Sequence, residues 1–224
     1  MTASYKPIRL TDRVIHDLAA GLVEHAAAAR LQNRRFILGI AGVAGSGKST
    51  LAERLVVAIN EHASAADVAV YAPMDGFHLR NDTLEQKGWV ARKGAPFTYD
   101  ASGYVGLLQR YRDRVETGDV PVYSREKHES VPGPHPVTDR TALLIAEGQY
   151  LLLTDEPWQR LAGVLDQTWW LDTPEDTAKR WTIRRHVAVG RTPEHAAEKY
   201  ENNDGPNSRL VREHRRPAHR VFVW

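Results

Sequence analysis

The stretch at residues 37–55, ILGIAGVAGSGKSTLAERL, decides the fold of this chain. Its residues 42–49 have the pattern GxxxxGKS, which is the spacing of a phosphate-binding loop. In such a loop consecutive backbone N–H groups curl around a phosphate chain, and glycine allows the close approach. We expect Lys48 to reach the β- and γ-phosphates of a nucleotide and the Ser49 hydroxyl to bind Mg²⁺. The predicted nucleotide-binding residues here are Gly42, Ala44, Gly45, Ser46, Gly47, Lys48, Ser49 and Thr50.

The residues on either side place this loop between a strand and a helix. The apolar run RFILGIA, residues 35–41, indicates a short buried strand. In KSTLAERLVVAINEH, residues 48–62, apolar side chains recur at helical spacing. The dipole and the free N–H groups of a helix N-terminus attract phosphate. This context favours a phosphate-binding loop over the alternative, a glycine-rich turn with a solvated lysine.

Length and composition fit one large α/β domain with a lid, spanning residues 1–224. The sequence has no cysteine, which fits a reducing cytoplasm, and its first residues lack the apolar core of a signal peptide. No uninterrupted apolar run is long enough to cross a bilayer. The formal net charge of +2 is too small to indicate binding to nucleic acid. We therefore expect a cytoplasmic protein that binds neither nucleic acid nor membranes, and a homodimer is compatible with the sequence.

Apolar strands and helical segments alternate along the chain. An amphipathic helix is expected at residues 11–30, and two irregular stretches are expected at 76–100 and 118–140. Apolar strands separated by helices imply a parallel sheet of about five strands with helices on both faces, a three-layer sandwich of the P-loop NTPase type. The expected strands are residues 36–41, 68–73, 141–148, 166–172 and 218–224.

Three helix starts can be predicted from capping residues. Asp100 can cap a helix that follows the first irregular stretch. Thr173 is expected to cap a helix whose first residue is Pro174. Thr192 and Pro193 repeat the same start signal.

Acidic side chains follow several of the predicted strands. In a parallel sheet ligands bind beyond the carboxyl ends of the strands, so Asp75, Glu147 and the phosphate loop should converge on one edge. We expect Asp75 to accept the proton of a phosphate acceptor, the alternative being a cap on the turn after its strand. We expect Glu147 to hold Mg²⁺, directly or through water, or to orient Asp75. Asp172, followed by Thr-Pro, is interpreted as a helix-start residue.

Arginines gather in the segment after residue 180, which we interpret as a lid over residues 184–207. Arg184, Arg185 and Arg191 could bring guanidinium groups onto a γ-phosphate, since their planar fork matches phosphate geometry. Closing such a lid would exclude water from the reaction. The alternative is that these arginines are solvated surface residues.

A series of segments resembles, in the same order, the type I pantothenate kinase, uridine kinase and phosphoribulokinase group of small-molecule kinases. The resemblance runs from residue 36 to residue 224 and is closest to pantothenate kinases in DGF, KGAPFTYD and PVYS. The phosphate loop looks more like that of uridine kinases, and RHVAVGRTPEHAAEKYENNDGPNSRLV is similar to bacterial homologues labelled sugar or nucleoside kinases. The other matching segments are MDGFHLRNDTLEQKG, VPVYSRE, LLIAEGQYLLL and DTPEDTAKRWTIRRH.

The resemblance implies roles for individual residues. Asp75 matches the catalytic aspartate of the group, Glu147 its acidic residue after the third strand, and Arg185 the arginine that reaches the transferring phosphate. Tyr123 matches a tyrosine on the acceptor side, while Arg125 stands where pantothenate kinases have a histidine, which weakens the case for pantothenate itself. The implied acceptor-binding residues are Tyr123, Arg125 and Asn207, and His78 and Tyr99 lie on the loops beside that site.

The sequence therefore predicts an ATP- and Mg²⁺-dependent kinase. It would transfer the γ-phosphoryl group to a hydroxyl of a nucleoside, a sugar or a pantothenate-like compound, with Asp75, Lys48 and Arg185 as catalytic residues and Arg191 on the nucleotide. The alternative is a nucleotide-dependent switch or assembly ATPase, although no Asn-Lys-x-Asp guanine-reading signature is present. A non-catalytic nucleotide-binding module would not explain Asp75 and Glu147 at neighbouring strand ends.

Overall fold

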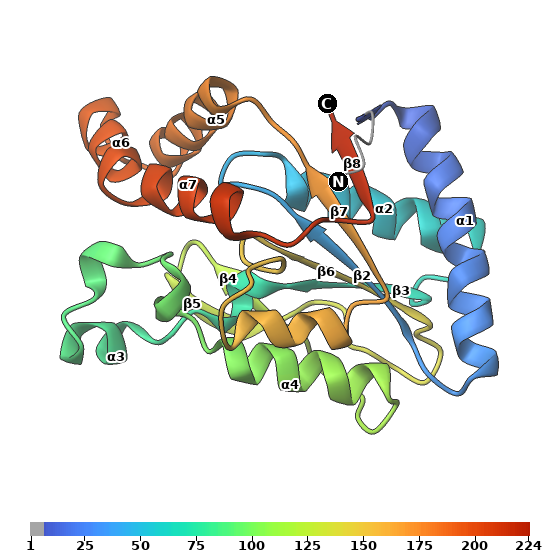
Figure 1. Cartoon of the computed structure of the whole chain (residues 1–224). Helices are drawn as coiled ribbons and strands as arrows, with labels where there is room; N and C mark the ends of the chain where they lie inside the picture. Colours follow the sequence, from blue (N-terminus) through green and yellow to red (C-terminus); the bar gives the residue numbers. More distant parts are fainter. Residues whose placement is uncertain (1–6) are drawn as a thin grey trace.

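The computed structural model describes residues 7–224 as a central sheet covered by helices on both faces (Figure 1). Helices α1 and α2 cover one face of the sheet and α4 covers the other. Helices α5, α6 and α7 lie beyond the carboxyl ends of the strands. The predicted three-layer α/β architecture is confirmed. The helices are α1 Asp12–Leu31, α2 Lys48–His62, α3 Asn81–Gln86, α4 Ala101–Arg112, α5 Glu175–Ala188, α6 Pro193–Lys199 and α7 Gly205–His214.

The main sheet has six parallel strands in the order β1-β8-β7-β2-β6-β3. Five are the predicted strands, and the sixth, β1, is a two-residue strand that pairs with β8 at the sheet edge. In the register of β6, Glu147 lies beside Ile40 of β2 and Pro73 of β3. The predicted convergence of these strand ends on one edge is therefore confirmed. The strands are β1 Ile8–Arg9, β2 Phe36–Ala41, β3 Ala69–Pro73, β6 Leu143–Gly148, β7 Gln167–Leu171 and β8 Arg220–Val223.

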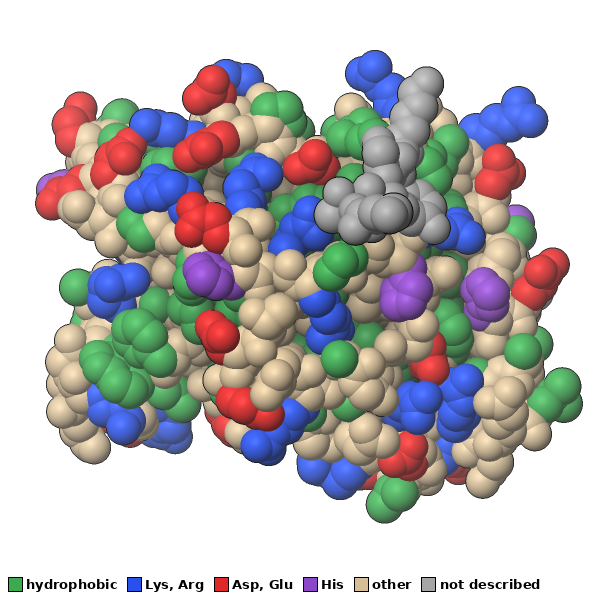
Figure 2. Space-filling view, in the orientation of Figure 1, with side chains coloured by type: hydrophobic (Ala, Val, Ile, Leu, Met, Phe, Trp, Pro, Cys, Tyr) green, Lys and Arg blue, Asp and Glu red, His purple; other side chains and the backbone are tan. Residues whose placement is uncertain are grey.

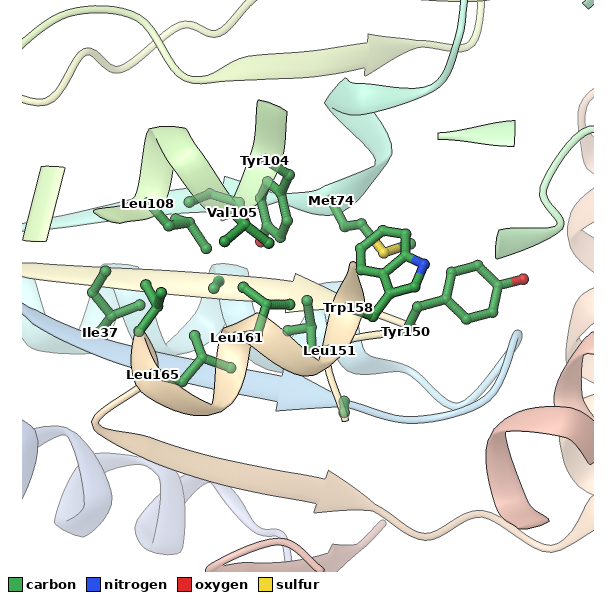
Figure 3. Close-up of a cluster of buried hydrophobic side chains, with 14 of the residues drawn as sticks. Ile37, Met74, Tyr104, Val105, Leu108, Tyr150, Leu151, Trp158, Leu161 and Leu165 are labelled. Carbon is green, nitrogen blue, oxygen red and sulfur yellow. The ribbon is translucent and has the colours of Figure 1, made fainter. Parts of the chain in front are cut away.

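Each face of the sheet is packed by its own apolar core. Strand β2 is buried throughout, and its successive side chains point to opposite faces. Leu38 therefore joins the core beneath α1 and α2, and Ile37 joins the core beneath α4. Figure 3 shows the second core, where Leu108 of α4 and Leu161 of the 3₁₀-helix Trp158–Gly163 lie over the sheet with Ile37. Burial on both faces explains why β2 is continuously apolar.

Two of the three predicted helix caps are confirmed. The Asp100 carboxylate accepts a hydrogen bond of 2.9 Å from Gly103 N, and the Thr192 hydroxyl accepts one of 3.3 Å from His195 N. The Thr173 prediction is wrong, because α5 begins after Pro174 without a side-chain cap. The Thr173 hydroxyl instead donates to the carbonyl oxygen of Ser46 at 3.3 Å, so it braces the phosphate loop.

The second irregular stretch contains a β-hairpin that the sequence did not predict. Its strands, β4 Pro121–Ser124 and β5 Glu129–Pro132, pair antiparallel, with Tyr123 opposite Ser130. The hairpin packs on the turn Met74–Phe77, where Ser130 Oγ donates to the Gly76 carbonyl. A Cβ at Gly76 would overlap the Pro121 carbonyl oxygen, so glycine allows this close approach. The hairpin thus carries Tyr123 to the turn that holds Asp75.

Charged side chains of both signs are interspersed over the face drawn in Figure 2, which accords with the net charge of +2.

Asp172, interpreted from the sequence as a helix-start residue, instead accepts hydrogen bonds from Trp170 Nε1 at 3.3 Å and Arg212 Nη1 at 3.4 Å. No helix within residues 7–224 combines the length and the apolar character needed to cross a membrane.

Candidate active site

The phosphate loop connects β2 to α2 in a conformation that leaves backbone N–H groups free. Helix α2 begins at Lys48, and its N-cap, Gly47, has a φ of 87° and provides no side-chain cap. The first N–H groups of a helix have no intrahelical partner, so here they remain available to an anion. This observation fits a nucleotide phosphate chain at the loop. Trp224 Nε1 supports the loop from outside by donating to the Ser46 carbonyl at 3.0 Å.

Gly45 is needed both for its backbone conformation and for space. Its φ is 72°, and an added Cβ would overlap the Ala178 carbonyl oxygen and Thr182 Oγ1 of α5. Gly88 has a similar φ of 67°, but nothing lies within 4 Å of the place that its Cβ would take. A comparison of alanine substitutions at the two glycines therefore separates two free-energy costs. One is the cost of the left-handed backbone conformation, and the other is the cost of the overlap with α5.

We expect Gly45→Ala to destabilise the protein more than Gly88→Ala. A left-handed conformation costs a non-glycine residue about 1–2 kcal/mol, and only Gly45→Ala adds a steric overlap with α5. Urea unfolding of the two variants and the parent measures the difference. An equal loss of unfolding free energy in both variants would contradict the close approach of α5 to the loop.

Glu147 is the centre of a buried polar cluster at the strand ends. The Lys48 Nζ lies 3.6 Å from Glu147 Oε1, and Lys48 also donates to the Val43 carbonyl at 3.3 Å. Ser49 Oγ and the Tyr71 hydroxyl both donate to Glu147 Oε2, at 3.2 Å and 2.7 Å. Glu147 is only 4% exposed, although it faces the cleft. Burial raises the pKa of the Glu147 carboxyl, and the nearby Lys48 ammonium opposes that rise.

This cluster has the chemistry of a site for a hard cation. A buried carboxylate is stabilised by a neighbouring positive charge, and Mg²⁺ prefers carboxylate and hydroxyl oxygens. Glu147 and Ser49 present such oxygens side by side. Residues 7–224 contain no group of three acidic or histidine side chains placed for a metal. Mg²⁺ commonly keeps water and substrate phosphates among its ligands, so one or two protein oxygens suffice.

Asp75 lies on the short 3₁₀-helix Met74–Phe77 that follows β3. The N-cap of this turn is Pro73, and the hydrogen bond recorded for the Asp75 carboxylate comes from Tyr99 and not from a backbone N–H of the turn, which speaks against the capping role that the sequence left open. Asp75 Oδ1 accepts a hydrogen bond from the Tyr99 hydroxyl at 3.4 Å. The His78 ring nitrogen lies 2.8 Å from the Asp75 carbonyl oxygen. Burial lowers the pKa of His78, so its imidazole is neutral near pH 7.

Lys48, Ser49, Asp75, His78 and Glu147 all line one cleft of about 760 Å³. It lies between the strand ends, the β4–β5 hairpin and the α5–α7 segment, which face one another in Figure 1. Most of the site residues predicted from the sequence line it. They are Ala44, Lys48, Ser49, Asp75, His78, Tyr99, Tyr123, Arg125, Glu147, Arg185 and Arg191.

The other predicted site residues do not line this cleft. The Asn207 side chain is buried and donates to the Gly94 carbonyl at 3.4 Å. Thr50 is exposed on the first turn of α2, and Ser46 Oγ is buried in the loop without a hydrogen-bond partner. Gly42, Gly45 and Gly47 contribute backbone to the loop around the cleft.

Sequence comparison places this geometry in a known group. A model of the phosphoribulokinase / uridine kinase family matches residues 37–219. The chain belongs to the phosphoribulokinase / uridine kinase family. The resemblance drawn from its motifs is thereby confirmed, and as a member of this family the chain is an ATP-dependent kinase of a small metabolite.

Individual relatives of this kinase carry different names. The uncharacterized protein YggC of Escherichia coli (strain K12) is 34% identical over 194 residues, covering 84% of this chain and 77% of that protein. The pantothenate kinase of Rhodopseudomonas palustris (strain TIE-1) is 30% identical, covering 74% of this chain and 54% of that enzyme. The crystal structure of a "putative fructose transport system kinase" from Silicibacter sp. TM1040 has a TM-score of 0.80 and 30% identity, covering 92% of this chain and 98% of that one.

Several residues that line the cleft of this kinase were not predicted from the sequence. His186 of α5 is hydrogen-bonded at 2.6 Å to Asp204, which ends the π-helix Tyr200–Asp204. Tyr71 of β3 does not line the cleft itself, but its hydroxyl donates to Glu147, which does. A tyrosine in the middle of an apolar strand is the one local signal that could have found Tyr71. The other unpredicted lining residues include Asn81, Lys93, Gln149 and Lys199.

Proposed function

We propose that this kinase transfers the γ-phosphoryl group of ATP to a hydroxyl of a nucleoside, a sugar or a pantothenate-like compound, with Asp75 as general base. The observation that supports this most is that Asp75, Lys48 and Arg185 border one cleft together with residues of the β4–β5 hairpin. The phosphate loop and the start of α2 contribute Ala44, Lys48 and Ser49 to the cleft lining, and the β4–β5 hairpin contributes Tyr123 and Arg125. A nucleotide at the loop and an acceptor at the hairpin would therefore meet beside Asp75.

Asp75 supplies the proton acceptor of the reaction. Its carboxylate takes the acceptor hydroxyl's proton as that oxygen bonds to the γ-phosphorus, and the bond from this phosphorus to the bridging oxygen breaks to release ADP. The Tyr99 hydroxyl, which donates to Asp75 Oδ1, orients the carboxylate. Burial raises the pKa of Tyr99, so this hydroxyl keeps its proton at neutral pH.

Positive side chains stabilise the phosphates. Lys48 is 8% exposed and held between the Val43 carbonyl and Glu147, which fixes its ammonium beside the loop. Arg185 and Arg191 face the same cleft from the predicted lid, residues 184–207. Arg185 Nε is buried and has no hydrogen-bond partner within residues 7–224, so it can donate to a phosphate oxygen. Ser49 and Glu147 would hold Mg²⁺, which neutralises phosphate charge when bound.

The acceptor would lie against His78, Tyr99 and Tyr123. The His78 ring packs between the two tyrosines, with ring centroids 4.1 Å and 4.8 Å away. Asn207 supports this site from behind through the Gly94 carbonyl. Three expectations from the sequence stay predictions. They are the cytoplasmic location, the single domain over residues 1–224 and the homodimer.

An acceptor screen separates a kinase from a switch ATPase. We expect ADP release by the purified protein to rise at least about tenfold over its acceptor-independent rate with one alcohol among sugars, nucleosides and vitamins. A coupled ADP assay measures both rates. Acceptor-independent turnover as fast as any stimulated rate would favour the switch ATPase.

We expect Arg185→Ala to lower kcat by on the order of a hundredfold, with little change in the KM for ATP. The reason is that a guanidinium that meets the transferring phosphate mainly in the transition state contributes to rate more than to ground-state binding. Arg184→Ala is the matched control, because Arg184 is exposed on the same helix and does not line the cleft. A normal kcat for Arg185→Ala would make Arg185 a surface residue.

A further inference from the structure

The cleft has a surplus of positive charge that the nucleotide does not account for. Three of its cations, Lys48, Arg185 and Arg191, are proposed to bind ATP. Two further cations, Lys93 and Arg125, belong to the segments that surround Asp75 and Tyr123. In full, the cleft is lined by Lys48, Lys93, Arg125, Arg185, Arg191 and Lys199 against Asp75, Glu147 and Asp204.

Lys93 is held in place without a carboxylate partner. Its Nζ donates to Asn81 Oδ1 at 2.6 Å and to the His128 carbonyl at 3.0 Å, and it lies 5.1 Å from the centroid of the Tyr123 ring. An ammonium has three donors, so one donor remains for a ligand. Both hydrogen-bond acceptors are neutral, and therefore the charge of Lys93 is not compensated by them.

The backbone of Lys93 is fixed by the α6 and π-helix region. Its carbonyl accepts hydrogen bonds from Lys199 Nζ and Asn203 Nδ2, both at 3.0 Å. The next carbonyl, that of Gly94, accepts a hydrogen bond from the Tyr150 hydroxyl at 2.5 Å. The loop that carries Lys93 is therefore preorganised, so binding a ligand there requires little ordering.

Arg125 faces the cleft from the end of the β4–β5 hairpin, two residues after Tyr123. Within residues 7–224 neither Arg125 nor Lys93 forms an ion pair with a carboxylate. Burial lowers the pKa of the half-buried His78 and Asp75 opposes that shift, while Lys93 and Arg125 add smaller lowering effects, so both cations lie close enough to act on this end of the cleft. Among the described residues of the turn Met74–Phe77 and of the β4–β5 hairpin, Asp75 has the one carboxylate that lines the cleft.

We propose that the phosphate acceptor carries an anionic group, a carboxylate or a phosphate, which binds to Lys93 and Arg125 while its hydroxyl lies at Asp75. This inference rests on the proposed kinase function and narrows its acceptor. A guanidinium and an ammonium that line one cleft with Asp75 suit an anion, and a neutral sugar or nucleoside would leave both charges unpaired.

Calorimetry tests the inference. It measures the binding of candidate acceptors to the protein loaded with Mg²⁺ and AMP-PNP, a non-hydrolysable ATP analogue. The probes are three pairs of an anion and its neutral counterpart, glycerate with glycerol, pantothenate with pantothenol, and fructose 6-phosphate with fructose. Sulfate and malonate serve as small anions without an acceptor shape. We expect at least one anion to bind on the order of tenfold or more tighter than its neutral counterpart, and the pairs distinguish carboxylate from phosphate.

Charge-removing variants assign that binding to the two cations. Lys93→Gln and Arg125→Gln should each weaken anion binding by roughly 10- to 100-fold and leave the affinity for AMP-PNP unchanged. Lys127→Gln is the matched control, because Lys127 is exposed in the same hairpin turn and does not line the cleft. Arg125 is exposed, so its variant keeps the test valid if Lys93→Gln fails to fold.

The outcomes separate this inference from the kinase assignment. Equal or tighter binding of the neutral counterparts, no anion binding to the loaded parent, or variants that bind anions as the parent does would overturn the anionic acceptor. Turnover of a neutral alcohol alone would overturn it while supporting the kinase. If no alcohol stimulates ADP release, the proposed function fails, and anion binding still decides the role of Lys93 and Arg125.

Discussion

Lys48→Ala is expected to reduce phosphoryl transfer by on the order of a thousandfold or more. The change removes the positive charge beside the loop where the β- and γ-phosphates would bind. It also leaves the Glu147 carboxylate without the ammonium 3.6 Å away, so the pKa of Glu147 rises further. Initial rates of acceptor-dependent ADP release measure the loss.

The fold should survive this substitution. Lys48 lies on the first turn of α2, and the core beneath that helix is formed by other side chains, Leu51 and Leu55 among them. A melting temperature within a few degrees of the parent, together with lost transfer, would assign Lys48 to the chemistry. Equal turnover of variant and parent would contradict the assignment of this loop.

Asp75→Asn is expected to lower phosphoryl transfer by roughly two to four orders of magnitude, because the amide cannot accept the acceptor's proton. Binding of ATP should persist, since the phosphate loop lies on another segment. The Asp75 carboxylate accepts its hydrogen bond from Tyr99, which an asparagine oxygen can also accept, so the melting temperature should change little. Turnover, ATP affinity and melting temperature, measured together, test these three expectations.

Asp82→Asn provides the comparison for Asp75→Asn. Asp82 is exposed, pairs with Arg80 at 3.3 Å and does not line the cleft. Its loss should leave transfer unchanged. If Asp75→Asn retained near-parental turnover and instead lost about 1 kcal/mol of unfolding free energy, the cost of a lost cap, with a lower melting temperature, Asp75 would be structural and Glu147 the next candidate.

The main sheet could be predicted because its strands are buried on both faces. Strand β2 is continuously apolar and β6 is apolar up to Glu147 for that reason, and the glycine pattern between β2 and α2 fixes where β2 ends. The β4–β5 hairpin escaped prediction because it is half-buried or exposed and has Pro121 and Pro132 at its ends. Such a segment has neither an apolar run nor a clear alternation. Strand β1 is too short to leave a periodic signal.

Capping could be predicted from the sequence where the capping side chain bonds to a backbone N–H of the same helix. Thr192 and Asp100 each accept a hydrogen bond from the residue three positions on, so neighbouring sequence suffices to find them. Thr173 fails as a cap because its hydroxyl is used by the Ser46 carbonyl, which lies 127 residues earlier in the chain. A tertiary contact of this kind has no local sequence signature.

The same distinction applies to the candidate site. The convergence of Asp75 and Glu147 follows from strand ends in a parallel sheet, so spacing alone predicts it. Lys93 lies in an irregular loop whose backbone is held by Asn203, 110 residues later. Its direction into the cleft depends on that contact and could not be read from the sequence around it.

The fate of the γ-phosphate tests the central claim most directly. With [γ-³²P]ATP and the acceptor found by the screen, we expect one phosphorylated alcohol to form for each ADP released, with little label in inorganic phosphate. Chromatographic separation of the labelled products gives this ratio in a single experiment. A kinase that excludes water must show this stoichiometry. Label that accumulates as inorganic phosphate at the rate of ADP release, with or without the alcohol, would contradict the account.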